Sequence, residues 1–344
     1  MNPITIVGGG LAGLTLGIGL RRQGVPVTVW EAGRYPRHRV CGEFISGRGL
    51  ESLERLGLRN KIVQAGALTA RSVSFSTNKA SSPVQELPLP ALCLSRHVLD
   101  NLLATEFCGC GGDLRAGERW RENAFGEGVV RATGRRAQPV AEGWRLFGLK
   151  AHARNVPLRA ELEMHLSPVG YVGLCRLSRD EVNVCGLFRS RTTVTDLPQT
   201  WPEWLRGAAG SPLRQLMAEA VFDTDSFCSI AGLSLRPRQA AAVDECCVGD
   251  AVTMIPPVTG NGMSMAFESA EIAVEPLAKY SRGEITWPEA RAQIACDCDA
   301  AFARRLRWAG WLQQGLFCPP VQAGLFFFAA RNGNVWRGLF DRTR

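Results

Sequence analysis

The 344-residue sequence lacks the signals of several protein classes. No apolar run approaches the ~20 residues that a membrane-spanning helix requires. Only four histidines are present, far apart in the sequence, so we expect no metal site. The net charge is +8, but no nucleic-acid recognition motif accompanies it, so we expect no nucleic-acid partner. A solvated basic surface is the simplest interpretation, and a basic face for an anionic cofactor, carrier or membrane surface is the alternative.

Signals for disulfides and zinc are also missing, although there are twelve cysteines. Six of them form three pairs that are too close in sequence to bond comfortably: Cys108 and Cys110, Cys246 and Cys247, and Cys296 and Cys298. No C-x-x-C spacing occurs. The N-terminus runs directly into a strand, so we expect no signal peptide. We therefore expect mostly buried thiols in a reducing cytoplasm.

The strongest motif that is present lies at the N-terminus. An apolar strand over residues 3–7 runs into Gly-Gly-Gly-Leu-Ala-Gly, then a helix, then a second strand that ends on Glu31. Gly8 permits a tight turn, Gly10 lets the backbone approach a diphosphate, and Gly13 lets helix and strand pack closely. The helix N-terminus attracts phosphates, and Glu31 can accept ribose hydroxyls. The motif predicts a dinucleotide site, FAD or NAD(P), formed by Gly8, Gly10, Leu11, Ala12, Gly13, Glu31 and Ala32.

The rest of the chain alternates between several kinds of pattern. We expect helices at 49–58, 95–103, 201–220 and 263–278, and a mostly helical segment from 286 onward. We expect strands at 73–76, 129–130, 160–166, 170–177, 182–188 and 246–248, and loops at 33–46, 78–90, 109–128 and 251–262. The strands after residue 144 alternate like an antiparallel meander.

The order of these patterns predicts an α/β fold in which a Rossmann-like nucleotide domain is interrupted by an antiparallel-sheet substrate domain. We assign residues 1–68, 92–143 and 232–280 to the nucleotide domain, and residues 69–91 and 144–231 to the substrate-facing sheet. Residues 281–344 form a helical C-terminal segment. The two ends of the nucleotide domain lie about 240 residues apart, which is why an insertion is the simplest architecture.

Six motifs occur in an order that resembles a known family. They are the glycine turn with Glu31, the 37–43 loop, Arg96, the Ala-Thr-Gly at 132–134, Gly249 with Asp250, and Pro-Pro-Val-Thr-Gly-Asn-Gly-Met at 256–263. Together they resemble the para-hydroxybenzoate-hydroxylase-like FAD oxidoreductases, over roughly residues 3–280. The stretch 40–46, Val-Cys-Gly-Glu-Phe-Ile-Ser, looks most like the geranylgeranyl-reductase-like branch.

The resemblance implies FAD as the cofactor and places further residues beside it. Asp250, after Gly249, would bind the ribityl chain, and Arg96 would lie near the diphosphate or ribityl, although a surface charge is its alternative. The implied contacts to the adenosine half are Arg37 or Arg39, and those to the ring end are Cys41, Gly42, Gly260, Asn261, Gly262 and Met263. Backbone amides that precede a helix would stabilise an anionic reduced flavin.

The sequence departs from the family pattern in ways that affect electron supply. Thr133 replaces the acidic residue of the usual Asp-Gly motif, the histidine often found after Gly-Asp-Ala is absent, and the stretch between Gly117 and Val129 is short. There is no second Rossmann glycine motif. NAD(P)H would therefore bind transiently as electron donor, or a separate flavin reductase or biosynthetic partner would supply the electrons.

The implied activity is a monooxygenase that hydroxylates a hydrophobic aromatic or polyketide-type natural product through a flavin C4a-hydroperoxide. A reductase that saturates C=C bonds and a non-catalytic flavin-binding partner protein are the alternatives. Cys41 is the candidate catalytic residue, as a thiol that gates the ring or donates a proton, although it could be simply a small buried residue. We also expect Arg39 and Glu43 to pair.

The substrate pocket should lie between the flavin and the antiparallel sheet. Its candidate wall residues are Tyr171, Leu174, Phe188 and Pro257, although most alternating apolar residues of a sheet are simply core. The Arg-, Trp- and Phe-rich C-terminal segment could cap this pocket, contact a membrane or partner, or pack on the domain.

Overall fold

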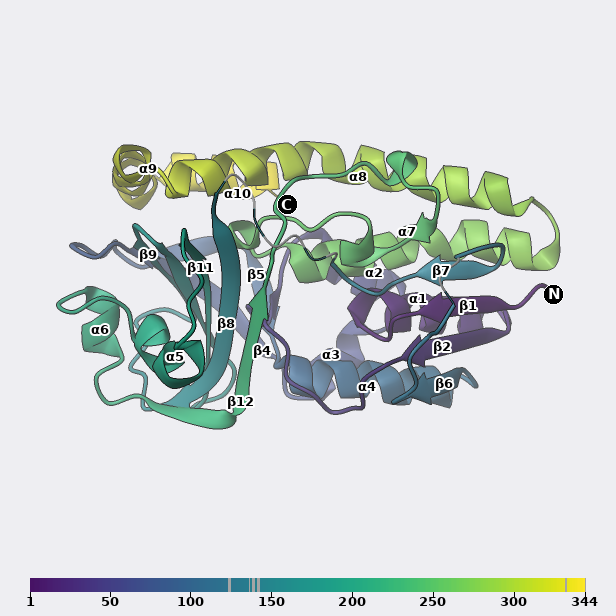
Figure 1. The fold of residues 1–344 in the computed structure, drawn as a ribbon, viewed down its shortest axis with the longest axis horizontal. Coiled ribbons are helices and arrows are strands. Elements are labelled where there is room, and N and C mark those ends of the chain that lie inside the picture. The colour runs from purple at the N-terminus through teal and green to yellow at the C-terminus, as the bar shows by residue number, and fades with distance from the viewer. Residues whose placement is uncertain (123–124, 136, 138–139, 141–142, 332, 344) are drawn as a thin grey trace.

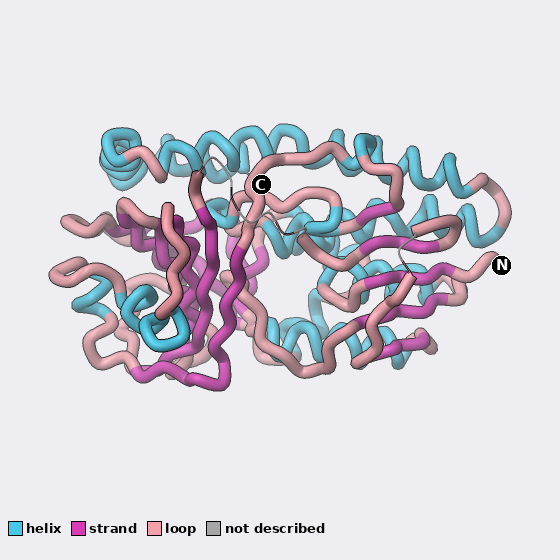
Figure 2. The backbone as a smooth tube through the Cα atoms, in the orientation of Figure 1, coloured by secondary structure: helices cyan, strands magenta, loops and turns pink. Residues whose placement is uncertain are grey.

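Two sheets organise the chain, and long helices run along one side of both (Figures 1 and 2). The computed structural model describes residues 1–122, 125–135, 137, 140, 143–331 and 333–343. The N-terminus lies at one end of the molecule, beside the five-stranded sheet, whereas the eight-stranded sheet forms the other end. The longest helix, α8 (Trp287–Leu316), extends over both sheets in Figure 1 and ties the two parts together.

The five-stranded sheet A is parallel throughout. Its order is β13 (Cys246–Cys247), β7 (Val129–Arg131), β1 (Ile4–Val7), β2 (Val27–Glu31) and β6 (Asp113–Ala116). The central β1 reads as a short apolar run because it is buried within the sheet. Helix α1 (Leu11–Arg22) follows β1 and packs against α4 (Arg96–Gly109) and α7 (Gly262–Arg282). Sheet A is therefore the Rossmann-like part that the sequence predicts.

The eight-stranded sheet B is mainly antiparallel. Its order is β12 (Val221–Ala231), β8 (Arg145–Arg154), β11 (Val182–Ser190), β10 (Gly170–Arg176), β9 (Leu162–Ser167), β4 (Leu68–Ser76), β5 (Gln85–Cys93) and β3 (Phe44–Ile45). Only the β4–β9 pair is parallel among the described strand pairs. The α/β fold class with an inserted antiparallel sheet is confirmed.

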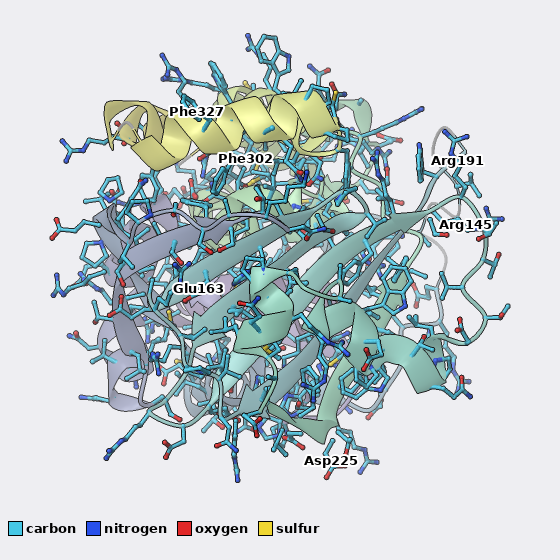
Figure 3. The ribbon with its side chains drawn as sticks, turned by 90° about the vertical axis from the view of Figure 1, so that its left-hand side faces the viewer. Arg145, Glu163, Arg191, Asp225, Phe302 and Phe327 are labelled. Atoms are coloured by element: carbon cyan, nitrogen blue, oxygen red, sulfur yellow. The ribbon has the colours of Figure 1, made fainter. Side chains whose placement is uncertain are left out.

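The two faces of sheet B have different partners because side chains alternate along a strand. The outer face is apolar and packs under α5 (Leu197–Arg206) and α6 (Pro212–Leu216), which stand in front of the strands in Figure 3. The inner face points toward the loop over residues 33–43 and toward sheet A. This face carries Lys150, His152 and Asn183, whose side chains contact that loop.

Three local expectations are wrong. Residues 85–90, expected as loop, belong to β5 (Gln85–Cys93), because Pro88 and Pro90 lie between its two paired stretches, at a register shift. The single helix expected over 201–220 is broken at Gly207, whose φ is +79°, into α5 and α6, and β12 follows directly. The segment 109–128, expected to be irregular, contains β6.

The remaining helices are shorter or lie at the C-terminus. They are α2 (Arg48–Arg55), α3 (Arg59–Gln64), α9 (Pro319–Arg331) and α10 (Gly333–Thr343), with single 3₁₀ turns η1 (Ala240–Ala242), η2 (Gly249–Ala251) and η3 (Pro257–Thr259). The helical C-terminal segment is thus confirmed. Helix α10 brings the chain back to the middle of the molecule, where the amide nitrogen of Asn261 donates a hydrogen bond to the carbonyl oxygen of Thr343.

A buried ion pair holds α7 and α8 together and gives a test of this packing. The guanidinium of Arg305 on α8 contacts the carboxylate of Glu268 on α7 at 2.7 Å, and both side chains are less than a tenth exposed. Glu268→Gln leaves the buried guanidinium uncompensated, so we expect the free energy of unfolding to fall by about 3–5 kcal/mol in denaturant titrations.

The matched control is the exposed pair between Arg55 and Glu271, which joins α2 to the same helix α7. Glu271→Gln should reduce the free energy of unfolding by at most about 1 kcal/mol. Equal losses in the two variants would contradict the role assigned to the buried pair.

Candidate functional site

The turn from β1 into α1 forms a cradle that suits a diphosphate. Gly8 has φ +115°, and a Cβ there would lie 2.2 Å from the carbonyl oxygen of Ala132. A Cβ on Gly13 would lie 2.0 Å from the carbonyl oxygen of Gly8, whereas one on Gly10 would meet nothing within 4 Å. The first turn of α1 holds no acidic residue, and the N–H groups of a first turn have no partner within their own helix. The space over Gly10 and these N–H groups therefore fit the diphosphate of FAD.

Glu31 lies beside this cradle with most of its hydrogen-bonding capacity used. Its carboxylate accepts the N–H of Gly9 at 2.8 Å, the N–H of Gly33 at 2.8 Å and the guanidinium of Arg37 at 2.6 Å. Burial acts to raise the pKa of Glu31, but the bonds from Arg37 and Gly33 outweigh it and leave the pKa lowered. A carboxylate has about four acceptor positions. One position thus stays open for the ribose hydroxyl that the sequence predicts.

The predicted basic residues take different positions. Arg37 is bound to Glu31, whereas Arg39 and Ala32 are exposed on the same loop. Arg96 begins α4 and forms an ion pair with the fully buried Asp100, at 2.6 Å. Its side chain is only 13% exposed, so the surface-charge alternative for Arg96 is wrong.

Asp250 lies near the cradle because its neighbour Gly249 packs closely against Ala12 in the first turn of α1. Gly249 has φ +63°, and a Cβ there would lie 2.8 Å from the Cβ of Ala12. Burial raises the pKa of Asp250 to about 6, and Arg96 and Arg135 partly oppose that shift. The carboxylate is therefore held near the N-terminus of α1, as a residue that binds the ribityl chain would be.

Three arginines that the sequence reasoning missed line a cavity of about 210 Å³ beside Asp250. They are Arg135, Arg236 and Arg238. Burial lowers the pKa of Arg135, and the Nε of its guanidinium is buried without a hydrogen-bond partner in the described ranges. No motif marks these positions in the sequence, because they come together only where the chain leaves sheet B and re-enters sheet A.

The loop before α7 fits the ring end of a flavin. Gly260 has φ +66°, and a Cβ there would lie 2.1 Å from the ring of Phe44, so this position requires glycine. Asn261 is fully buried, and its side-chain oxygen has no hydrogen-bond partner in the part of the chain that the structure describes. An unpartnered buried acceptor suits the imide N–H of a flavin pyrimidine ring. A Cβ on Gly262 would meet nothing within 4 Å, so this turn is open, and Met263 is buried at the start of α7.

Cys41 lies in the 33–43 loop against sheet B. Its sulfur accepts the N–H of Glu43 at 3.4 Å, and its carbonyl oxygen accepts the side-chain amide of Asn183 at 2.9 Å. Burial raises the pKa of the Cys41 thiol, although Arg96 acts to lower it. A thiol with a raised pKa stays protonated at neutral pH and can donate a proton.

Glu43 does not pair with Arg39, so that expectation is wrong. Its carboxylate is fully buried and points into sheet B, where it lies 2.7 Å from Nε2 of His152 and 3.5 Å from Nζ of Lys150. Nζ of Lys150 also lies 3.1 Å from Nδ1 of His38. The hydrogen-bonding partners of Glu43 and His38 therefore come from strand β8 of sheet B and not from the loop.

Three histidines that are far apart in the sequence lie close together here. The ring of His38 stacks on His97 at 4.6 Å between centroids and meets His152 at 5.1 Å. In the described ranges, no group of three or more His, Cys, Asp and Glu residues is arranged to hold a metal ion. The only sequence pattern that pointed to this cluster is the placement of Lys150 and His152 on the same face of β8. Polar side chains on one face of a strand more often indicate that this face is exposed to solvent.

The predicted substrate residues fall on opposite faces of sheet B. Leu174 and Phe188 belong to the outer face, under α5. Tyr171 lies on the other face, where its hydroxyl donates to the side-chain oxygen of Gln313 on α8 at 3.0 Å. Pro257 lies in η3 on this second side, next to Val258, which packs in the same cluster as Tyr171. The four residues therefore cannot line one pocket, because successive side chains of a strand point to opposite faces.

The open space over Gly10 allows a specific test of the cradle. We expect Gly10→Ala to leave the apoprotein as stable as wild type, because the new methyl group meets no atom within 4 Å. We expect its affinity for FAD to fall about tenfold or more, which corresponds to 1.4 kcal/mol or more, because the methyl group occupies the path of the diphosphate.

Gly109→Ala is the matched control, because a Cβ there also meets nothing within 4 Å but lies at the far end of α4. Fluorescence titration with FAD and thermal melting of the apoprotein check both variants. Unchanged FAD affinity in Gly10→Ala would exclude this turn as the diphosphate site.

Comparisons with known proteins add to this geometry. Residues 1–142 match the family described as FAD binding domain. The squalene epoxidase erg1 of Aspergillus fumigatus is 24% identical over 316 residues, which are 77% of this chain and 64% of that protein. The chain therefore spans less than two thirds of the length of this curated relative.

Solved structures resemble the chain over nearly its whole length. The flavin-dependent brominase Bmp2 superposes with a TM-score of 0.77 at 18% identity, over 99% of this chain and 92% of that one. The protein pqsL of Pseudomonas aeruginosa, described as a probable FAD-dependent monooxygenase, superposes with a TM-score of 0.70 at 18% identity, over 94% of this chain and 99% of that one.

The likeness to solved structures shows that the fold of this chain is shared with flavin-dependent enzymes. The family match adds that its N-terminal part is similar to FAD binding domains. None of these comparisons distinguishes the geranylgeranyl-reductase-like branch, which stays a prediction from residues 40–46. The family match over residues 1–142 and the shared fold agree with the resemblance to the para-hydroxybenzoate-hydroxylase-like FAD oxidoreductases that the sequence motifs predict.

Proposed function

We propose that the protein is an FAD-dependent monooxygenase that hydroxylates a hydrophobic aromatic or polyketide-type natural product. The observation that carries this proposal is an apolar wall next to the loop that precedes α7. Its buried members are Leu166, Tyr171, Leu187, Leu233 and Leu316, and Met254 and Val258 of the loop pack against them. A hydrophobic substrate is stabilised by burying its surface against such a wall.

The names of the relatives support oxygenation. The curated relative is a squalene epoxidase, and one structural neighbour is described as a probable FAD-dependent monooxygenase. When bound, FAD supplies the redox chemistry. The residues of this chain would hold the cofactor at Asp250 and Asn261, keep Cys41 protonated beside it, and exclude water with the apolar wall.

A reductase that saturates C=C bonds is the second candidate. The observation that favours it is the protonated thiol of Cys41, because reduction of a double bond needs a proton donor as well as a hydride. In this reading Cys41 gives its proton to the substrate carbon and regains one from solvent. The same residue could serve either reaction, so the product decides between them.

We propose transient binding of NAD(P)H, or a separate flavin reductase, as the source of electrons, because the sequence has a single Rossmann glycine motif.

We also propose a peripheral contact with a membrane or biosynthetic partner through α8. Trp311 there is 71% exposed, and Arg304 and Arg307 are exposed two turns and one turn before it, respectively.

None of the helices in the described part of the chain combines the length and the apolar character that a membrane span needs.

All twelve cysteines are free. The free thiols are compatible with the cytoplasmic location that we propose.

Product analysis tests the proposed function. The purified protein is loaded with FAD and given NAD(P)H, with and without an added flavin reductase, together with O₂ and hydrophobic aromatic or polyene candidates. We expect a product that gains one oxygen atom, coupled to O₂ uptake. A product that gains two hydrogens would establish the reductase instead, and a protein whose reduced flavin reoxidises at the same rate with every candidate would contradict both.

The role of Cys41 has its own test. We expect Cys41→Ser to bind FAD normally but to lower kcat about a hundredfold, because a serine hydroxyl is a much weaker acid than a thiol. Cys108→Ser, at an exposed position on α4, is the control and should match wild type. Steady-state kinetics for Cys41→Ser that equal those of the control would exclude a catalytic role.

A further inference from the structure

A line of hydrogen-bonded ionisable groups leads from the surface to the loop that carries Cys41. Glu181, at the start of β11, is 38% exposed, and its carboxylate lies 3.1 Å from Nδ1 of His152. The other ring nitrogen of His152, Nε2, lies 2.7 Å from Oε2 of Glu43. We name Glu181, His152 and Glu43 the Glu43 chain.

The interior end of this chain is buried and held from two sides. Oε1 of Glu43 accepts the backbone N–H of Arg96 at 2.8 Å and lies 3.5 Å from Nζ of Lys150. Both Glu43 and Lys150 are fully buried. These contacts fix one carboxylate oxygen and leave the other, Oε2, to His152. Lys150 and Arg96 are thus positioning residues for Glu43.

Burial of these charges is poorly explained by stability alone. A buried ion pair is often no more stabilising than apolar side chains of the same volume, because both ions lose their hydration. Glu43 also has φ +60°, a left-handed conformation that non-glycine residues rarely adopt. Two unfavourable features at one residue, beside the predicted flavin site, point to a function.

Both candidate reactions need a route for protons. Hydroxylation with NAD(P)H, O₂ and a substrate C–H consumes one proton and yields NAD(P)⁺, the alcohol and water. Reduction of a C=C bond with NAD(P)H likewise consumes one proton and yields NAD(P)⁺ and the saturated product. A line of hydrogen-bonded ionisable groups that reaches the surface provides such a route.

Resting on the proposed flavin-dependent function, we propose that the Glu43 chain transfers protons between solvent and the loop that carries Cys41. Glu181 takes a proton from water and passes it to Nδ1 of His152. Nε2 of His152 gives its proton to Oε2 of Glu43, and Glu43 releases it toward the reaction site. One proton moves inward per turnover, a half-turn of the imidazole ring then brings its remaining N–H back to the side of Glu43 and its unprotonated nitrogen back to the side of Glu181, and no electrons are transferred.

The charges around His152 favour this role. Burial lowers the pKa of His152, but the bonds to Glu181 and Glu43 outweigh it, so the pKa is raised above its ordinary value. Burial and the charge of Lys150 hold the pKa of His38 at about 4, so that histidine stays neutral and accepts a hydrogen bond from Lys150. His152 is therefore the member of the pair that takes up an additional proton more readily.

The remaining ionisable groups that face the chain come from every element around it. They are Arg96 and His97 on α4, Cys41 on the loop, Arg154 on β8, Cys175 on β10, Cys185 on β11 and Cys228 on β12. Burial raises the pKa of all four of these cysteines. These cysteines therefore add no negative charge near neutral pH. The acidic groups that favour the charged form of His152 are the carboxylates of Glu43 and Glu181.

The experiment compares Glu181→Gln with Asp180→Asn in the FAD-loaded protein. Asp180 is the neighbouring exposed acid and donates only its backbone N–H to Ser178, so it is a matched control. Bound FAD is photoreduced in weakly buffered solution, and proton uptake is followed with a pH-indicator dye. We expect Glu181→Gln to slow proton uptake about tenfold or more, and added imidazole to restore it, whereas Asp180→Asn matches wild type.

Titration of His152 by NMR gives a readout that needs neither FAD nor substrate. Its resonance is identified by its loss in His152→Gln. We expect a pKa above the ordinary value in wild type, and a lower pKa in Glu181→Gln because one of its two carboxylates is removed.

Equal rates of proton uptake in wild type, Glu181→Gln and Asp180→Asn would overturn the proposal, even if the pKa of His152 shifts. That combination would show a structural hydrogen bond only. If instead Glu181→Gln slows proton uptake while no candidate substrate is converted, the Glu43 chain stands and the proposed function fails.

Discussion

The close approach of backbones at the N-terminus of α1 is the constraint on which the rest of the structure depends. Gly8 packs against Ala132, Gly13 packs against Gly8, and Gly249 packs against Ala12. These contacts bring three segments from distant parts of the chain together around one helix N-terminus. A side chain at Gly8 or Gly13 would force the segments apart, and both the phosphate cradle and the position of Asp250 would be lost.

Sheet B adds the second half of the site through the alternation of its side chains. Its outer face is ordinary apolar core under α5 and α6. Its inner face carries buried charge, with Lys150 and His152 directed at the loop between β2 and β3. This loop also contains Cys41, so the inner face of sheet B contacts the candidate catalytic loop directly. Its side chains contact His38, Glu43 and the carbonyl oxygen of Cys41 in that loop.

The cofactor end of the site was predictable from the sequence because local motifs encode it. The strand, glycine turn and helix form one short segment, and its spacing reflects the geometry of a single backbone turn. The reactive end was less predictable. Glu43 was expected to bind Arg39, its neighbour in sequence, but it binds His152, which is 109 residues away. Tyr171 and Leu174 were grouped as pocket walls because both are apolar, although they point to opposite faces of the same sheet.

The α/β class with its inserted antiparallel sheet and the helical C-terminal segment could be predicted from the sequence and are confirmed, and the glycine turn that we predict to cradle FAD could be recognised there too. Hydrophobic periodicity and glycine spacing act over a few residues, so they can be read without knowledge of the fold. Only the tertiary structure decided that three distant histidines meet, that the C-terminal Thr343 contacts Asn261, and that a chain of carboxylates and imidazole reaches the surface at Glu181. These contacts depend on strand order and register, which no local pattern specifies.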